Sequence, residues 1–191
     1  MRNLLIVMLG LMALGALGCA SGGAGALDDR GVWRVIVVRH AEKRDDASDD
    51  PGLTESGRGW AEELGRFCVS QGVTGVVSTP YRRTMETAWP TAREAGVRVQ
   101  MVPASSGVEA HAEGVVRVIE GDGMGGNWLV VGHSNTVGAV IARLMGGGPA
   151  AVEIGEMEYG RVFVVDIGGR GGPVEREGLL RDGEFVLSGG G

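Results

Sequence analysis

The chain has 191 residues, 43% of them hydrophobic, and a formal net charge of −6. This length and composition predict one domain with a sizeable apolar core. The acidic balance argues against a nucleic-acid partner, because binding to phosphates along a duplex needs a basic face. Lys43 is the only lysine, so any anion site must be built mainly from arginine side chains.

The first nineteen residues predict an export signal. Arg2 supplies a positive start, and residues 4–17 form an uncharged apolar run that is too short for a comfortable membrane span. The run ends at Gly18-Cys19, which resembles a bacterial lipoprotein signal, with Cys19 as the lipidated first residue of the mature chain. An ordinary signal peptide or an uncleaved anchor is the alternative. We therefore expect an exported protein that faces the periplasm or the cell exterior and is held to the membrane only by the lipid.

Residues 20–31 predict a flexible tether, and beyond them apolar runs alternate with amphipathic patterns. This alternation favours an α/β fold, a three-layer α/β/α sandwich around a mostly parallel sheet. The domain is expected over residues 32–170, followed by a glycine-rich tail over 171–191 with a weak edge strand. The expected strands lie over 33–38, 73–78, 97–102, 127–131 and 161–167, with the edge strand at 184–187. The first expected helix runs from a cap at Thr54 to about residue 70, and the second is opened by Thr79 and Pro80. The third covers 107–120, and the fourth is capped by Ser134 and ends near residue 145.

Two of the three histidines directly follow predicted strands. His40 comes after a β-branched run that ends in Arg39, and His133 comes after the run 129–132. Ligands of open α/β sheets bind beyond the carboxyl ends of the strands, so we expect both imidazoles at the same rim. Imidazole can attack phosphorus as the free base, and the arginine fork matches phosphate oxygens. This combination suggests phosphoryl chemistry on a histidine.

A third polar segment, residues 79–88, also follows a predicted strand and opens a helix. Helix N-termini offer unpaired N–H groups and the positive end of the helix dipole, which favour a phosphate. The segment contains Arg83, so a second guanidinium is expected at the rim.

These residues resemble the histidine phosphatase superfamily, also called the phosphoglycerate-mutase-like family. The chain carries the family's Arg-His-Ala motif at 39–41, its Thr-Pro-x-x-Arg-Thr-x-x-Thr-Ala pattern at 79–88 and its Gly-His-Ser motif at 132–134. Residues 53–57 match the family's Leu-Thr-x-x-Gly segment. Each motif alone is weak, but together and in this order they are specific. The resemblance implies the phosphoglycerate mutase-like fold.

The resemblance also implies roles in a catalytic site. His40 would be the nucleophile that becomes phosphorylated, and Arg39 and Arg83 would hold the phosphate oxygens. His133 would complete the pocket, bind the phosphate and stabilise the charge of the transferring group.

Family members commonly place a carboxylate after the third strand to protonate the leaving oxygen. Glu109 is the expected residue, and Glu113 in the same predicted helix is the alternative. His111, which lies between them, is expected to be a histidine on the helix surface.

A metal hydrolase that uses His40, Glu42 and His133 is disfavoured, because arginines at the same rim fit an anion better than a cation. We expect no metal and no other cofactor. The acidic loop 45–50 lacks the spacing of a calcium loop and is expected to be solvated. Cys68 is expected to be a buried inert thiol, and the four tryptophans are expected to pack in or beside the core.

The expected function is a metal-independent phosphatase that hydrolyses a small phosphorylated substrate through phosphohistidine at His40. A non-catalytic binder of phosphoryl ligands with the same fold is the alternative. A phosphomutase is less favoured, because residues 102–128 form a connection too short for a substrate lid and Asp45-Asp46 stand where mutases carry Asn. The physiological substrate and the oligomeric state stay open.

Overall fold

The computed structural model describes residues 31–121, 125–150 and 152–188, and these ranges include four helices and seven strands. The predicted signal peptide, the lipidation site at Cys19 and nearly all of the tether lie outside the described residues. Within the described ranges, no helix combines the length and the apolar character that a membrane span requires.

The elements follow each other in the alternating order that the sequence predicts. They are β1 (Trp33–Arg39), α1 (Glu55–Ser70), β2 (Val73–Ser78), α2 (Arg82–Ala95), β3 (Val99–Met101), α3 (Val108–Gly121), β4 (Asn127–Gly132), α4 (Ser134–Leu144), β5 (Arg161–Ile167), β6 (Val174–Arg181) and β7 (Glu184–Leu187).

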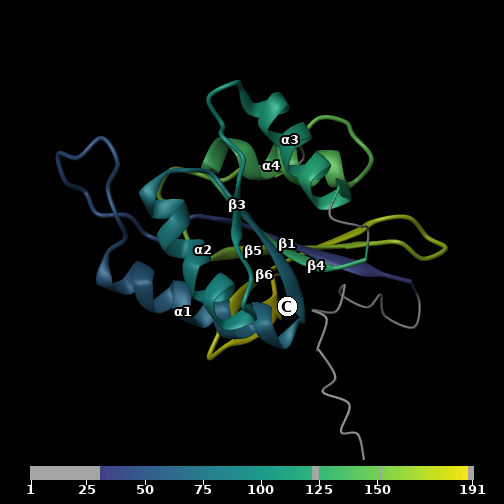
Figure 1. Cartoon of the computed structure of the whole chain (residues 1–191), viewed down its shortest axis with the longest axis horizontal. Helices are drawn as coiled ribbons and strands as arrows, with labels where there is room; N and C mark the ends of the chain where they lie inside the picture. Colours follow the sequence, from purple (N-terminus) through teal and green to yellow (C-terminus); the bar gives the residue numbers. More distant parts are fainter. Residues whose placement is uncertain (1–30, 122–124, 151, 189–191) are drawn as a thin grey trace, which may run out of the picture.

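The seven strands form a single mixed sheet in the order β3-β2-β4-β1-β5-β6-β7. β3, β2, β4 and β1 run parallel to one another, whereas β5, β6 and β7 add to the edge of β1 as antiparallel neighbours. Helices α1 and α2 lie on one side of the sheet and α3 and α4 on the other (Figure 1). The predicted α/β/α architecture is therefore confirmed, with a parallel half and an antiparallel half.

The inner strands are apolar on both faces because helices cover both faces. Successive side chains of β1 alternate between two cores. Val35 and Val37 pack with the α3 and α4 side, and Ile36 and Val38 pack with the α1 and α2 side. All four valine and isoleucine side chains are fully buried. The carboxyl ends of the parallel strands therefore carry the first polar groups beyond a dry core.

The sheet continues past residue 170, where the sequence predicts only a tail and an edge strand. β6 pairs along its length with β5, and β7, at the predicted edge position, pairs with β6. β6 is rich in charge and is held by cross-strand pairs such as Arg161 with Glu177 (2.8 Å) and Arg176 with Asp166. A strand of this kind has no apolar run by which to recognise it.

Two of the three predicted N-cap residues differ from the observed ones. The hydroxyl of Thr54 accepts a hydrogen bond from Gly57 N (2.9 Å), which confirms the cap of α1. The N-cap of α2 is Tyr81 rather than Thr79, and the N-cap of α4 is His133 rather than Ser134. The extended backbone before α2 therefore continues two residues further than expected, whereas α4 begins one residue earlier than expected.

Three side-chain placements can also be compared with expectation. Cys68 is buried as predicted, and burial raises its thiol pKa to about 12, so the thiol stays protonated. Trp89 is 58% exposed on α2, so the prediction that all four tryptophans are in or beside the core is wrong. The prediction for His111 is also wrong, because its side chain is 1% exposed and Nδ1 lies 3.3 Å from the carbonyl of Pro103.

Candidate active site

The two histidines lie side by side at the carboxyl ends of neighbouring parallel strands. β1 and β4 pair with Arg39 opposite Gly132, and the backbone N–H of His40 donates to the carbonyl of Gly132 at 3.0 Å. The imidazole centroids of His40 and His133 are 5.5 Å apart, with the rings at 67°. The rim that the sequence predicts therefore exists, and both histidines are almost fully buried in it.

Gly132 permits the close turn between β4 and α4. A Cβ at this position would lie 2.7 Å from the Thr136 hydroxyl. That hydroxyl accepts a hydrogen bond from the backbone N–H of His133 at 2.9 Å. The glycine thus leaves room for Thr136 to fix the backbone of His133 at the start of the helix.

His40 is held as a neutral base. Its Nδ1 lies 2.8 Å from the carbonyl of Ala41, and a carbonyl can only accept, so Nδ1 carries the proton. Nε2 has no hydrogen-bond partner among the described residues and keeps its lone pair. Burial, opposed by that hydrogen bond and aided by the charges of Arg39 and Arg83, lowers the pKa of His40 to about 4. An imidazole of this kind can act as a nucleophile at neutral pH.

His133 has a different environment. Its Nε2 lies 2.9 Å from the hydroxyl of Thr79, which in turn lies 2.7 Å from the hydroxyl of Thr84. Both threonines are fully buried. Burial first, and then the positive charge of Arg83, lowers the pKa of His133 to about 3. The ring is thus neutral and fixed by a side-chain network, while the ring of His40 is fixed by its own backbone.

The two predicted phosphate-binding arginines both lie at this site. Arg39 is 3% exposed and donates through Nη1 to the backbone carbonyls of Gly155 (2.7 Å) and Glu158 (3.2 Å). Its guanidinium also stacks on the ring of Tyr159, 4.4 Å from the centroid. The Nε atoms of Arg39 and Arg83 are buried and have no hydrogen-bond partner.

An unsatisfied buried donor of this kind costs about 1–3 kcal/mol, more when it carries charge. Two such donors beside a pair of neutral imidazoles can donate hydrogen bonds to an oxyanion. Arg83 Nη1 does lie 3.5 Å from Asp50, and its guanidinium stacks on Tyr81 at 4.5 Å. The two guanidinium groups are therefore oriented by aromatic rings and retain hydrogen-bonding capacity for an oxyanion.

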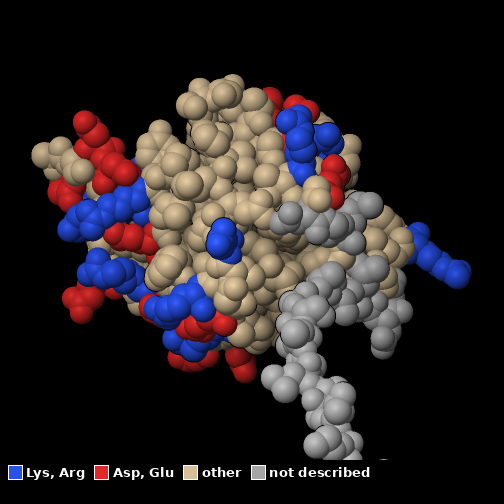
Figure 2. Space-filling view, in the orientation of Figure 1, with Lys and Arg blue, Asp and Glu red and all other residues tan. Residues whose placement is uncertain are grey.

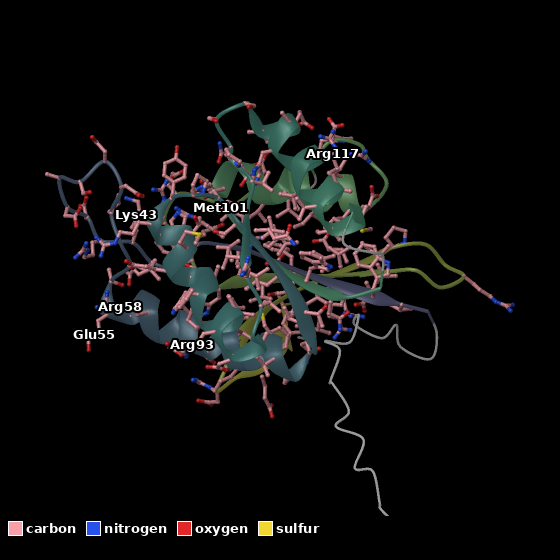
Figure 3. All side chains as sticks on the ribbon, viewed as in Figure 1. Lys43, Glu55, Arg58, Arg93, Met101 and Arg117 are labelled. Atoms are coloured by element: carbon pink, nitrogen blue, oxygen red, sulfur yellow. The ribbon has the colours of Figure 1, made fainter. Side chains whose placement is uncertain are left out.

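A cavity of about 390 Å³ opens over these groups. Besides the two histidines and the two arginines, Lys43 contributes a further positive charge from the turn after β1, at the left of the molecule in Figure 3. In the face shown in Figure 2, charged side chains of both signs gather over α1, α2 and the loop that follows β1. The full lining is Arg39, His40, Lys43, Tyr81, Arg83, Ala104, His133, Ser134, Asn135 and Glu156.

The backbone that carries His40 is supported from two helices. The N–H of Ala41 donates to the buried hydroxyl of Thr87 on α2 at 3.0 Å. The N–H of Thr54, at the cap of α1, donates to the carbonyl of Glu42 at 3.0 Å. A Cβ at Gly57 would lie 2.3 Å from that same carbonyl, so only glycine fits there. Residues outside the cavity thus position the loop that carries His40.

The acidic loop 45–50 is more than a solvated loop. Both carboxylate oxygens of Asp50 accept from the backbone N–H of Arg82 (2.9 and 3.0 Å), at the positive end of α2. Among the described residues, no group of three or more His, Cys, Asp or Glu side chains is arranged to hold a metal ion.

The carboxylate expected after the third strand is not at the cavity wall. Glu109 is exposed on the first turn of α3, and Glu113 pairs with Arg117 on the outer side of that helix. Neither lines the cavity, whereas Glu156 does. Glu156 comes from the irregular segment between α4 and β5, where no periodic pattern marks its position. Sequence reasoning also missed Tyr81, Tyr159 and Thr79 as parts of the site.

The fold and this pocket define a class: an α/β/α sandwich with a histidine–arginine pocket suited to an oxyanion at the carboxyl ends of its parallel strands. Residues 35–106 match the family model described as Histidine phosphatase superfamily (branch 1). This match supports membership of that superfamily. The search of curated proteins finds no match.

Solved structures with the same fold are similar over most of the chain. The mycobacterial glucosyl-3-phosphoglycerate phosphatase has a TM-score of 0.59 at 15% identity, covering 78% of this chain and 98% of that one. The putative alpha-ribazole-5'-P phosphatase of Escherichia coli has a TM-score of 0.60 at 16% identity, covering 82% and 99%. The protein histidine phosphatase SixA, complexed with tungstate, has a TM-score of 0.59 at 18% identity, covering 74% and 93%. These similarities establish the fold.

Proposed function

We propose that this protein is a phosphatase of the histidine phosphatase superfamily that hydrolyses small phosphomonoesters through a phosphohistidine intermediate on His40. The observation that carries the proposal is the free Nε2 of a neutral, buried imidazole in a cavity with two partly unsatisfied guanidinium groups. The structural neighbours named above include phosphatases of phosphoesters and of phosphohistidine, which supports the same chemistry.

The reaction has two halves. In the first, the substrate phosphate binds between Arg39 and Arg83, and His40 Nε2 attacks phosphorus. The P–N bond forms as the P–O bond to the leaving group breaks, and a leaving oxygen that needs a proton takes it from solvent water at the open side of the cavity. His133 and the guanidinium groups stabilise the charge on the equatorial oxygens.

In the second half, water attacks the phosphorus, the P–N bond breaks and the electron pair returns to His40. Inorganic phosphate then leaves, and His40 is again the neutral base. No residue in this cycle requires a cofactor, so we propose that turnover is independent of added metal.

Detection of the intermediate tests the proposal. The protein, incubated with p-nitrophenyl phosphate and quenched in base, is expected to carry an acid-labile phosphoryl group on His40. Turnover is expected to persist in the presence of a chelator and to disappear in His40→Ala. Binding of phosphate without turnover across a broad panel of phosphoesters would instead favour the non-catalytic binder.

We also propose that the protein is exported and anchored through lipid at Cys19. The support is the sequence pattern of residues 1–19 alone. Expression in bacteria fed a labelled fatty acid should place the label on the wild-type protein in the membrane fraction. Cys19→Ala should remove the label. An unlabelled wild-type protein in the soluble fraction would contradict this proposal.

A further inference from the structure

The mouth of the cavity holds a carboxylate that the proposed reaction does not yet use. Glu156 is the only Asp or Glu among the described residues that line the cavity. Its Oε1 accepts a hydrogen bond from the hydroxyl of Ser134 at 2.7 Å, and its Oε2 lies 3.5 Å from Nη2 of Arg39. The carboxylate is thus held by two groups, one of which is a proposed phosphate ligand.

The depth of the groups in the cavity gives the direction of the reaction. His40 is 3% exposed and forms the buried floor, whereas the side chain of Glu156 is 81% exposed. In phosphoryl transfer, the attacking and leaving groups lie roughly in line on opposite sides of phosphorus. With His40 on the floor, the leaving group departs and water enters on the open side, where Glu156 lies.

The ionisation state of Glu156 decides whether its side chain can donate or accept a proton. The hydrogen bond from Ser134 and the charge of Arg39 both hold the pKa of Glu156 below its usual value. An ionised carboxylate accepts a proton and has none to donate. The useful step for such a group is activation of the water that hydrolyses the phosphohistidine.

We infer that Glu156 is the general base of the second half-reaction, an inference that rests on the proposed function. Its carboxylate takes one proton from the attacking water as the new P–O bond forms. The P–N bond breaks, its electron pair returns to His40 Nε2, and phosphate leaves. Glu156 then releases the proton to solvent. The first half-reaction does not depend on this residue when the leaving group departs without a proton.

The test is a comparison of wild type and Glu156→Gln with p-nitrophenyl phosphate, whose leaving group needs no proton. The amide keeps the size of the side chain but cannot act as the base. We expect kcat to fall about 100-fold, the scale of general-base catalysis, with KM falling in parallel and kcat/KM almost unchanged. A stoichiometric burst of nitrophenol should appear, and phosphohistidine should accumulate on the protein.

Glu153→Gln is the matched control, because it makes the same change of charge three residues away, on an exposed side chain that does not line the cavity. Its kcat should equal that of wild type. In Glu156→Ala, added formate should restore dephosphorylation, which a purely structural role of Glu156 would not allow.

The inference is overturned if Glu156→Gln keeps the wild-type kcat, or if kcat/KM falls as much as kcat without accumulation of phosphohistidine. Failure of the proposed function gives a different result: wild type itself forms no phosphohistidine, or His40→Ala retains turnover.

Discussion

The carboxyl ends of β1 and β4 carry the same residue type in the same register position but hold it in different ways. At the end of β1, the backbone carbonyl of Ala41 fixes Nδ1 of His40 and leaves Nε2 free. At the end of β4, Nε2 of His133 lies against the hydroxyl of Thr79, inside a buried network. The hydrogen-bond partner of each ring, rather than the residue type, therefore distinguishes the proposed nucleophile from the proposed supporting group.

The supports of the two ends differ as well. The loop after β1 is held by two hydrogen bonds. The backbone N–H of Ala41 donates to the hydroxyl of Thr87 on α2, and the backbone N–H of Thr54, at the cap of α1, donates to the carbonyl of Glu42. His133 is itself the cap of α4 and sits at that helix's positive end. The end of β1 thus presents an imidazole nitrogen without a hydrogen-bond partner, which we propose is the reactive atom, and the end of β4 presents an imidazole fixed by hydrogen bonds. The following predictions test this difference.

Loss of His40 should have the largest effect. His40→Ala is expected to lower kcat at least about 10⁴-fold, because removal of a covalent nucleophile leaves only the binding groups. Steady-state turnover of p-nitrophenyl phosphate measures it, with binding of inorganic phosphate by calorimetry as the control for an intact pocket. Residual turnover within tenfold of wild type would assign the nucleophile elsewhere.

The second largest expected effect is the lowered pKa of the His40 and His133 imidazoles. Histidine NMR resonances should show His40 titrating near pH 4, against an ordinary pKa of 6.5, and His133 titrating near pH 3. For His40 this is about 300-fold weaker proton binding than in the unfolded chain.

The same shift makes stability depend on pH. The unfolded chain binds a proton between pH 6.5 and 4 that folded His40 does not. The stabilisation is therefore present above pH 6.5 and is lost as the pH falls toward 4. Denaturant unfolding at a series of pH values should show this decline. Titration of His40 near 6.5 in the folded protein would be inconsistent with the neutral, buried nucleophile.

His133→Ala should cost less than His40→Ala. We expect a fall in kcat of about 100-fold, the scale observed when one group that stabilises transition-state charge is removed. This variant should still form phosphohistidine slowly, whereas His40→Ala should form none. Rapid-quench measurement of protein-bound phosphate separates the two cases. The distinction between the strand ends collapses if both variants fail to form the intermediate.

Thr79→Val tests the network behind His133. The change conserves shape but removes the hydroxyl that lies 2.9 Å from Nε2, so a decrease in kcat of about tenfold is expected from poorer positioning. Thr91→Val, at a second fully buried threonine that lies on α2 and does not line the cavity, is the matched control and should keep the wild-type kcat. Equal kcat values for the two variants would show that the hydroxyl of Thr79 does not position His133.

The smallest effect on kcat is expected at Glu109, the carboxylate that the family resemblance suggests as the proton donor. Glu109 is exposed and does not line the cavity, so Glu109→Gln should change kcat less than about twofold. Measurement with both an aryl and an alkyl phosphate covers leaving groups with and without a need for a proton. A selective loss on the alkyl phosphate would restore Glu109 as the proton donor.

Much of this site could be predicted from the sequence, because its central residues come directly after apolar runs. The strand ends that carry His40 and His133 follow local patterns of burial. Thr54 and Gly57, which brace the loop after β1, follow from the resemblance to the family's motifs. The two arginines follow from the same motifs. Glu156 and Tyr159 do not, since they lie in an irregular segment that reaches the cavity only through the pairing of β5 with β1.

The fold shows the same division. Alternating apolar runs and amphipathic stretches, which depend only on neighbouring residues, determined the layers, the parallel strands and the rim where the histidines meet. Tertiary structure alone decided that β6 extends the sheet through charge pairs, that His111 is buried, and that α2 starts at Arg82. Each of these depends on contacts between different elements of the fold. The choice between the two histidines is of this kind too, because hydrogen bonds within the folded site leave one Nε2 free and engage the other.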